Sequence, residues 1–125
     1  MPRYGDAIME HFRHPRNVGV VSDANAVGED TNPVCGDKLR LTLRIRAAVI
    51  EDARFQTEGC VGAIAAGSVA TELLKGMQTS AAAALSREDI DRALGGLPPA
   101  KRHAAVLVES CLRKALEGYR SRRTG

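Results

Sequence analysis

The sequence predicts a domain of the α+β class, in which antiparallel strands are followed by a series of helices. Two patterns support this prediction. Between Lys38 and Ile45, leucine or isoleucine alternates with a polar residue, which is typical of a half-buried strand. After Cys60, apolar residues recur at spacings of three and four, which is typical of helices. A chain of 125 residues has the length of one domain, so we expect a single domain over 1–125.

The strands are predicted from the middle of the chain. Residues 20–30 are ambiguous and contain at most a short strand around Ala26 to Gly28. The alternating segment 38–45 is a strand, and Ala47-Ala48 is the expected hairpin connection. Residues 49–57 form the next strand, which we expect to return antiparallel to the first.

The remaining elements are predicted to be helices. Ser86 and Asp89 have the spacing of a capping box, and Gly76 is suited to end a helix. The apolar stripe of the last helix consists of Ala104, Leu107, Val108, Cys111, Ala115 and Tyr119. The helices are expected at about 4–14, 61–74, 79–85, 86–95 and 99–120.

Composition restricts the classes of function. The net charge is +3, and much of the excess lies in Arg120, Arg122 and Arg123, without interleaved aromatic residues, so we expect no nucleic-acid partner. The first residues lack the apolar run of a signal peptide, and no stretch has the length of a membrane span. We therefore expect a cytoplasmic protein, whose three cysteines are free thiols or metal ligands rather than disulfides.

Four residues with metal-binding chemistry are predicted to lie near one another. Cys35 and Asp37 share a turn before the first confident strand, and Cys60 follows its antiparallel partner, so both lie at the same end of the hairpin. Cys60 also begins a helix, where the helix dipole favours a thiolate. If the last helix starts at that end, His103 completes a set suited to zinc or to iron in a cluster. The alternative is that Cys35 and Asp37 only shape a turn, and His11 and His14 are expected at the surface or in packing.

Several motifs follow one another at matching spacings over almost the whole chain. They are His14-Pro15-Arg16-Asn17-Val18-Gly19, Val34-Cys35-Gly36-Asp37, Ile50-Glu51-Asp52-Ala53-Arg54-Phe55, Gly59-Cys60 and Leu97-Pro98-Pro99-Ala100-Lys101. In these motifs the chain resembles the IscU/NifU-type scaffolds of iron–sulfur cluster assembly. The resemblance implies an IscU/SufE-like fold, with a small antiparallel sheet of about three strands covered by helices.

The resemblance also implies a function that is not enzymatic. A cysteine desulfurase delivers sulfur, iron is added, and a [2Fe–2S] cluster is built and passed to acceptor proteins. The cluster-binding residues of the family correspond to Cys35, Asp37, Cys60 and His103. The segment that a specialised Hsp70-type chaperone recognises corresponds to Leu97–Lys101, with Ala100 in place of valine.

One position departs from the family pattern. The family has a third cysteine directly after the histidine, where this chain has Ala104, whose methyl group can neither bind a metal nor accept sulfur. Cys111 lies seven residues further, about 10 Å along a helix, so it cannot reach the same ion. We expect Cys111 to be a buried apolar thiol.

Two alternatives to the scaffold interpretation stay open. In the first, the protein has lost assembly chemistry and holds a single zinc ion as a structural or regulatory element. In the second, Cys60 alone relays sulfur as a persulfide. The sequence contains no glycine-rich phosphate loop with a lysine, so a nucleotide site is not expected.

Overall fold

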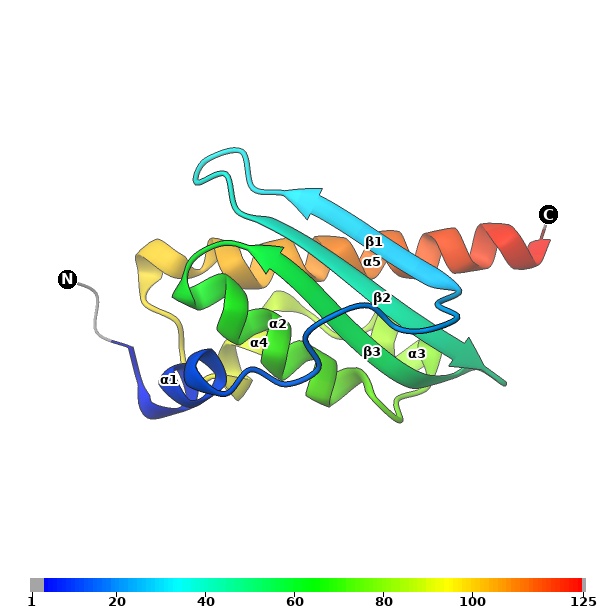
Figure 1. Cartoon of the computed structure of the whole chain (residues 1–125), viewed down its shortest axis with the longest axis horizontal. Helices are drawn as coiled ribbons and strands as arrows, with labels where there is room; N and C mark the ends of the chain where they lie inside the picture. Colours follow the sequence, from blue (N-terminus) through cyan, green and yellow to red (C-terminus); the bar gives the residue numbers. More distant parts are fainter. Residues whose placement is uncertain (1–3, 125) are drawn as a thin grey trace.

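A three-stranded antiparallel sheet lies on a layer of helices in the computed structural model, which describes residues 4–124 (Figure 1). The sheet has the order β1-β2-β3. The strands are β1 (Ala26–Thr31), β2 (Lys38–Arg46) and β3 (Val49–Glu58). The helices are α1 (Asp6–Arg13), α2 (Val61–Leu74), α3 (Thr79–Ala83), α4 (Arg87–Ala93), the 3-10 turn η1 (Pro99–Lys101) and α5 (His103–Thr124). The predicted α+β class with a small sheet is confirmed.

The register of the sheet brings two loops to one edge. Lys38 at the start of β2 pairs with Thr31 at the end of β1 and with Glu58 at the end of β3. The loop that connects β1 to β2 therefore lies beside the loop that connects β3 to α2. These loops contain Cys35 and Cys60, so the predicted proximity of the two segments is confirmed.

One face of the sheet packs on the helices. Helix α5 lies against β1 and β2, α2 lies against β3 and α5, and α1 packs on α2. The alternation predicted for β2 is confirmed, because Leu39, Leu41, Leu43 and Ile45 are all buried. Thr42 is also buried, since the segment before β1 crosses the open face and the backbone N–H of Val21 donates to the Thr42 hydroxyl at 3.0 Å.

Gly28 sets how closely α5 approaches the sheet. A Cβ atom at this position would lie 1.8 Å from the carbonyl oxygen of Cys111 and 2.7 Å from the backbone nitrogen of Ala115. Only a residue without a side chain permits this contact between strand and helix backbones. The contact fixes α5, whose first residue is His103, relative to the sheet.

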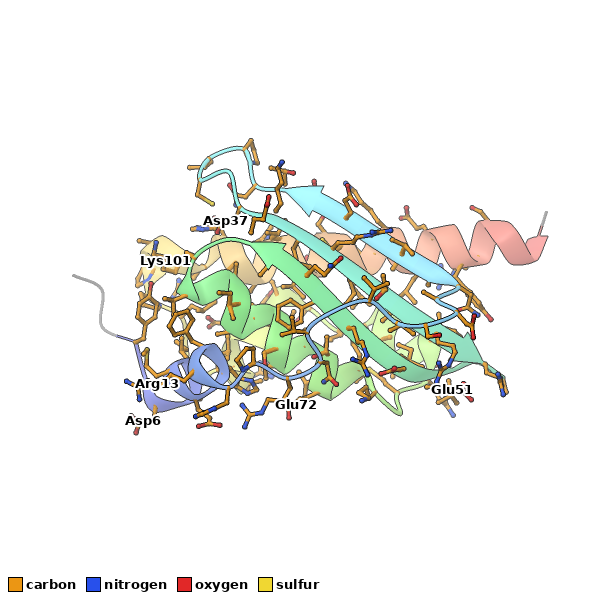
Figure 2. All side chains as sticks on the ribbon, viewed as in Figure 1. Asp6, Arg13, Asp37, Glu51, Glu72 and Lys101 are labelled. Carbon is orange, nitrogen blue, oxygen red and sulfur yellow. The ribbon has the colours of Figure 1, made fainter. Side chains whose placement is uncertain are left out.

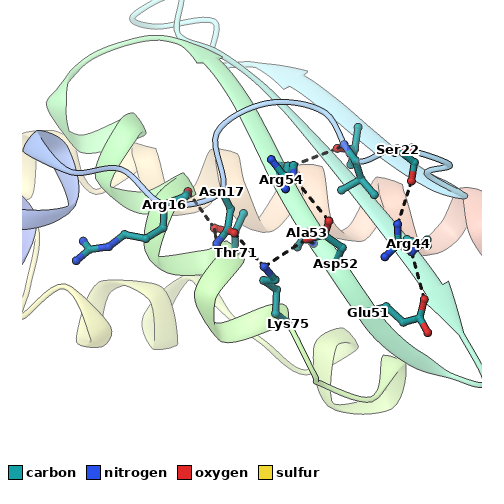
Figure 3. A network of polar contacts seen from close by, with 12 residues as sticks. Arg16, Asn17, Ser22, Arg44, Glu51, Asp52, Ala53, Arg54, Thr71 and Lys75 are labelled. Carbon is teal, nitrogen blue, oxygen red and sulfur yellow. Dashed lines mark hydrogen bonds and ion pairs between the residues drawn. The ribbon is translucent and has the colours of Figure 1, made fainter.

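The outer edge of β3 is covered by the segment that follows α1. The backbone N–H of Phe55 donates to the carbonyl of Asn17 at 2.9 Å, and Gly19 donates back to Phe55 at 2.8 Å. The Asn17 side chain donates to Thr71 of α2 at 3.1 Å and accepts from Lys75 at 3.1 Å (Figure 3). This network joins the 14–19 motif to both the sheet and α2.

Several element boundaries differ from the prediction. Helix α3 ends at Ala83 rather than at 85, and α5 continues to Thr124, beyond the expected end at 120. Strand β1 continues to Thr31, because its last residues pair with β2 in a regular ladder that local sequence does not reveal. The last helix does not begin at Pro99, which opens a separate 3-10 turn, and α5 begins only at His103. Helix α1 ends at Arg13 rather than His14. The capping box of Ser86 and Asp89 is present as predicted.

No helix within residues 4–124 is both long enough and apolar enough to span a bilayer.

Candidate metal centre

The first wall of the site is the loop between β1 and β2, which Asn32 organises. The Asn32 side chain accepts a hydrogen bond from the Val34 backbone N–H at 2.8 Å. The backbone N–H of Asn32 donates to the Asp37 carbonyl, also at 2.8 Å. Gly36 has a φ of +77°, a left-handed conformation that favours glycine. The turn leaves Cys35 exposed to solvent and turns Asp37 inward, where it is 8% exposed.

The second wall is the entry to α2. Gly59 lies directly against Asp37, because a Cβ atom at Gly59 would be 3.1 Å from the Asp37 carboxyl carbon. Cys60 follows as the N-cap residue of α2, and its side chain makes no capping hydrogen bond. Its thiol is half-buried and free of any disulfide.

The third wall is the start of α5. His103 is the first residue of this helix, and its Nε2 atom lies 3.9 Å from Oδ2 of Asp37. That separation is too long for a hydrogen bond. Both atoms are buried and without a hydrogen-bond partner in the part of the chain that the structure describes. Two buried polar atoms that lie this close together, each without a hydrogen-bond partner, are what a shared ion would satisfy.

The structure brings three of the four predicted residues into one cluster. Ligand atoms of Cys35, Asp37 and His103 all lie within 4.8 Å of one another. Cys60 is not part of this cluster. Its sulfur lies instead near Gly62 of α2, where a Cβ atom would be 3.6 Å from the Cys60 sulfur and 3.5 Å from the Ala104 methyl. The same position is 3.6 Å from Cβ of Lys101, and Figure 2 shows Lys101 and Asp37 at the same end of the molecule.

The spacing of the cluster fits a single ion. Nitrogen and oxygen ligands of a tetrahedral ion lie about 2.1 Å from the metal, which places them roughly 3.4 Å apart. The 3.9 Å between His103 and Asp37 needs only a small closure to reach this value. Because Cys35 is exposed, the cluster opens to solvent, and an ion has a path of entry.

The other candidate residues lie elsewhere. Cys111 is completely buried in α5, its thiol donates to the Leu39 carbonyl at 3.3 Å, and burial raises its pKa to about 12. The expectation of a buried apolar thiol is confirmed. His11 is half-buried, with Nδ1 at 2.7 Å from the Ser68 hydroxyl, and burial lowers the pKa of its imidazole. His14 is exposed.

Sequence reasoning assigned no separate role to Asn32 or to Gly59. Asn32 is followed directly by Pro33 and precedes Cys35 by three residues. This pattern is typical of a turn that an asparagine side chain stabilises, so the sequence did contain a signal for it. Gly59 stands in the Gly59-Cys60 motif, but the motif does not reveal its role, which comes from contact with Asp37, a residue far from it in sequence.

The chain is similar to known proteins of one family. Residues 3–125 match the family described as NifU-like N terminal domain. A relative from Archaeoglobus fulgidus, named iron-sulfur cluster assembly scaffold protein IscU 1, is 44% identical over 116 residues, covering 93% of this chain and 76% of that protein. An Aquifex aeolicus protein, named iron-sulfur cluster assembly scaffold protein IscU, is 45% identical over 118 residues, covering 93% and 75%.

A solved structure has the same fold. The crystal structure of a SufU protein from Fervidobacterium islandicum superposes with a TM-score of 0.74 at 20% identity, covering 90% of this chain and 96% of that one.

Proposed function

The chain belongs to the NifU-like N-terminal domain family, and we propose that it is a scaffold on which an iron–sulfur cluster is assembled before transfer to acceptor proteins. The observation that carries the proposal is the cluster of Cys35, Asp37 and His103, with its two unpartnered buried atoms. A thiolate, a carboxylate and an imidazole form a set of donors suited to ferrous iron. The protein then holds its cargo and catalyses no reaction of its own.

The four predicted residues receive different roles in this proposal. Cys35, Asp37 and His103 hold the first iron ion, because their ligand atoms already lie together. Cys60 approaches from the neighbouring loop and joins as the cluster is built. Two thiolates then bind the cluster alongside two harder ligands, so the cluster is expected to be more labile than one held by four cysteines.

Ala104 determines the strength of binding. Its methyl group is completely buried beside Gly62 and supplies no ligand. Each remaining ligand therefore contributes a larger share of the free energy of metal binding. The share of Asp37 is the largest, since its carboxylate faces His103 across the site.

Anaerobic reconstitution with iron and sulfide, followed by absorption spectroscopy, tests the proposal. We expect the wild-type protein to develop a charge-transfer chromophore that disappears on transfer to an apo-ferredoxin acceptor. Asp37→Ala should form less of it, and Ala104→Cys should form a more persistent one. A chromophore that develops only in Ala104→Cys would overturn the proposal.

Zinc is the alternative occupant, because a cysteine, a carboxylate and a histidine also form a zinc site. Metal analysis of protein purified without oxygen separates the two ions. Stoichiometric zinc that is not displaced by iron, even with a cysteine desulfurase and cysteine present, would favour a structural or regulatory role.

The partners follow from the proposed scaffold role. They are a cysteine desulfurase, iron–sulfur acceptor proteins and an Hsp70-type chaperone at Leu97–Lys101, all in the cytoplasm. Within this segment Pro99 and Ala100 are exposed, whereas Leu97 is 3% exposed and its backbone N–H donates to Asp91 at 2.7 Å. Chaperone binding in an extended form therefore requires local opening of this segment, and Asp91→Ala should strengthen chaperone binding by removing one restraint.

A further inference from the structure

We infer that Asn32 is a positioning residue that keeps the Cys35 thiolate at the metal, and that it thereby determines which ions the site prefers. This inference rests on the proposed scaffold function and concerns a residue that is not itself a ligand. The side chain of Asn32 holds Cys35, whereas the backbone of Asn32 holds Asp37. The two ligands of this loop are thus held by separate groups of one residue.

The backbone of Asn32 closes the loop at its base. Its N–H donates to the carbonyl of Asp37 at 2.8 Å, and its carbonyl accepts from the N–H of Gly36 at 2.8 Å. Any residue other than proline can make both bonds from position 32. Asp37 is also 8% exposed and in contact with Gly59, so packing holds it as well. The position of Asp37 therefore does not depend on the side chain of Asn32.

The side chain of Asn32 holds the outer part of the loop, which projects beyond the end of the sheet (Figure 1). Its Oδ1 atom accepts from the N–H of Val34 at 2.8 Å and from the N–H of Cys35 at 3.4 Å. Residues 33–36 are all exposed, so packing against the core does not fix them. An asparagine oxygen that accepts from the second residue after it stabilises such a turn by itself. The Asn32 side chain therefore determines where the backbone of Cys35 lies.

The backbone of Cys35 determines in turn whether its sulfur reaches the ion. The ligand atoms of Cys35, Asp37 and His103 lie within 4.8 Å of one another in the closed turn. Release of the turn would let the exposed thiol move into solvent, and its return to the ion would then cost conformational entropy. Asp37 and His103 would stay in place, because neither is bonded to the Asn32 side chain.

Loss of the thiolate would change the ions that the site prefers. Thiolate and imidazole ligands favour zinc, whereas carboxylate ligands suit manganese. With Cys35 in place the site therefore prefers zinc over manganese. A site reduced to Asp37 and His103 would retain less of this preference, so Asn32 controls it without contacting the ion.

Asn32→Leu tests the inference, because leucine has a similar size but no hydrogen-bond acceptor. We expect zinc affinity to fall about tenfold and manganese affinity to stay unchanged. In the cobalt-substituted protein, the sulfur-to-cobalt charge-transfer band should weaken. Asn32→Asp keeps an acceptor oxygen and should keep the band. In a Cys35→Ser background, Asn32→Leu should not lower zinc affinity further, because the ligand through which Asn32 acts is already absent.

Asn25→Leu is the matched control. The Asn25 side chain accepts from the N–H of Ile45 at 2.8 Å and donates to the Ile45 carbonyl at 2.7 Å. This pair lies at the end of β1 and β2 away from Cys35. We expect Asn25→Leu to lower the urea midpoint and to leave zinc affinity and the cobalt band unchanged.

The outcomes separate the inference from the proposed function. An undiminished thiolate band in Asn32→Leu would overturn the inference while leaving a metal-binding scaffold. An equal loss of zinc affinity with and without Cys35, or an equal loss in Asn25→Leu, would overturn it too, because the effect would then be general destabilisation. A wild-type protein that binds neither zinc, cobalt nor iron would overturn the proposed function itself.

Discussion

The Nε2 atom of His103 lies 3.9 Å from Oδ2 of Asp37, and both atoms are buried without a hydrogen-bond partner in the described chain. A buried polar group that lacks its partner costs about 1–3 kcal/mol of folding free energy. The apo protein therefore retains an unfavourable pair at this position. A bound ion would satisfy both atoms, so metal binding and stability should be coupled there.

Asp37→Ala should weaken zinc or iron binding at least tenfold, because the substitution removes one of three clustered ligands. In the chelator-treated protein, the same change should leave the free energy of unfolding unchanged or slightly raised, since it removes an unpartnered buried carboxylate. Chelator competition and urea denaturation measure the two effects. Glu58→Ala is the matched control, because it removes an exposed carboxylate from the end of β3, outside the cluster. Equal metal affinity in Asp37→Ala and the wild type would contradict the assignment.

Gly28→Ala should destabilise the protein by about 3 kcal/mol, because the new methyl group would overlap the carbonyl oxygen of Cys111. Relief of the overlap requires α5 to move away from β1, and His103 would move with it. We therefore expect weaker metal binding as well as a lower urea midpoint.

Gly118→Ala is the control for this substitution. It lies on the same helix, and a Cβ atom there meets nothing within 4 Å. Alanine favours helix over glycine, so this variant should be more stable by about 1 kcal/mol. If the two substitutions changed the free energy of unfolding by similar amounts, close packing at Gly28 would not be what sets the distance between α5 and β1.

Glu109→Gln should destabilise the protein by about 2 kcal/mol, because charge-assisted hydrogen bonds are lost. Glu109 is 3% exposed and accepts from the Arg87 backbone at 2.7 Å and from its guanidinium at 2.9 Å. Arg113, 3.6 Å from Glu109 and 63% exposed, is the control, and Arg113→Gln should cost less than about 0.5 kcal/mol. Urea denaturation at neutral pH measures both values.

The effect of Glu109 should also depend on pH. Burial opposes its charge, but hydrogen bonds from Arg87 outweigh burial and hold the pKa of Glu109 below its ordinary value of 4.5. A carboxyl group with a depressed pKa in the folded state stabilises the fold fully above its unfolded pKa. That stabilisation is lost as the pH falls through the folded pKa. The difference between wild type and Glu109→Gln should therefore shrink below about pH 4.5, and a constant difference in acid would contradict this account.

Patterns that act within one element were predictable from the sequence. The alternation in β2, the capping box at Ser86 and the burial of Cys111 each follow from spacing along the chain, and each is confirmed. The antiparallel hairpin also predicted that the loops of Cys35 and Cys60 share one end of the sheet.

Contacts between distant segments were not predictable in this way. The approach of α5 to Gly28 and the cover of the β3 edge by Asn17 depend on how whole elements pack, which no local pattern records. At the candidate site, the spacing of residues along the sequence predicts which segments lie near one another. It does not predict separations of a few ångströms between atoms. The separation of Cys60 from the cluster of Cys35, Asp37 and His103 emerges only from the packed backbone.

The turn between β2 and β3 should be improved by substitution. Ala47 and Ala48 have φ values of +53° and +62°, a left-handed conformation that costs alanine about 1 kcal/mol per residue. Asparagine followed by glycine suits a two-residue hairpin turn of this geometry. The double substitution Ala47→Asn with Ala48→Gly should therefore raise the free energy of unfolding by about 1 kcal/mol, after the greater flexibility of glycine in the unfolded chain is counted.

Ala81→Gly, within helix α3, is the control and should lower the free energy of unfolding by a similar amount. Because the turn lies at the end of the sheet opposite the metal cluster, zinc affinity should not change, and a destabilised double variant would show that the alanine turn is not strained.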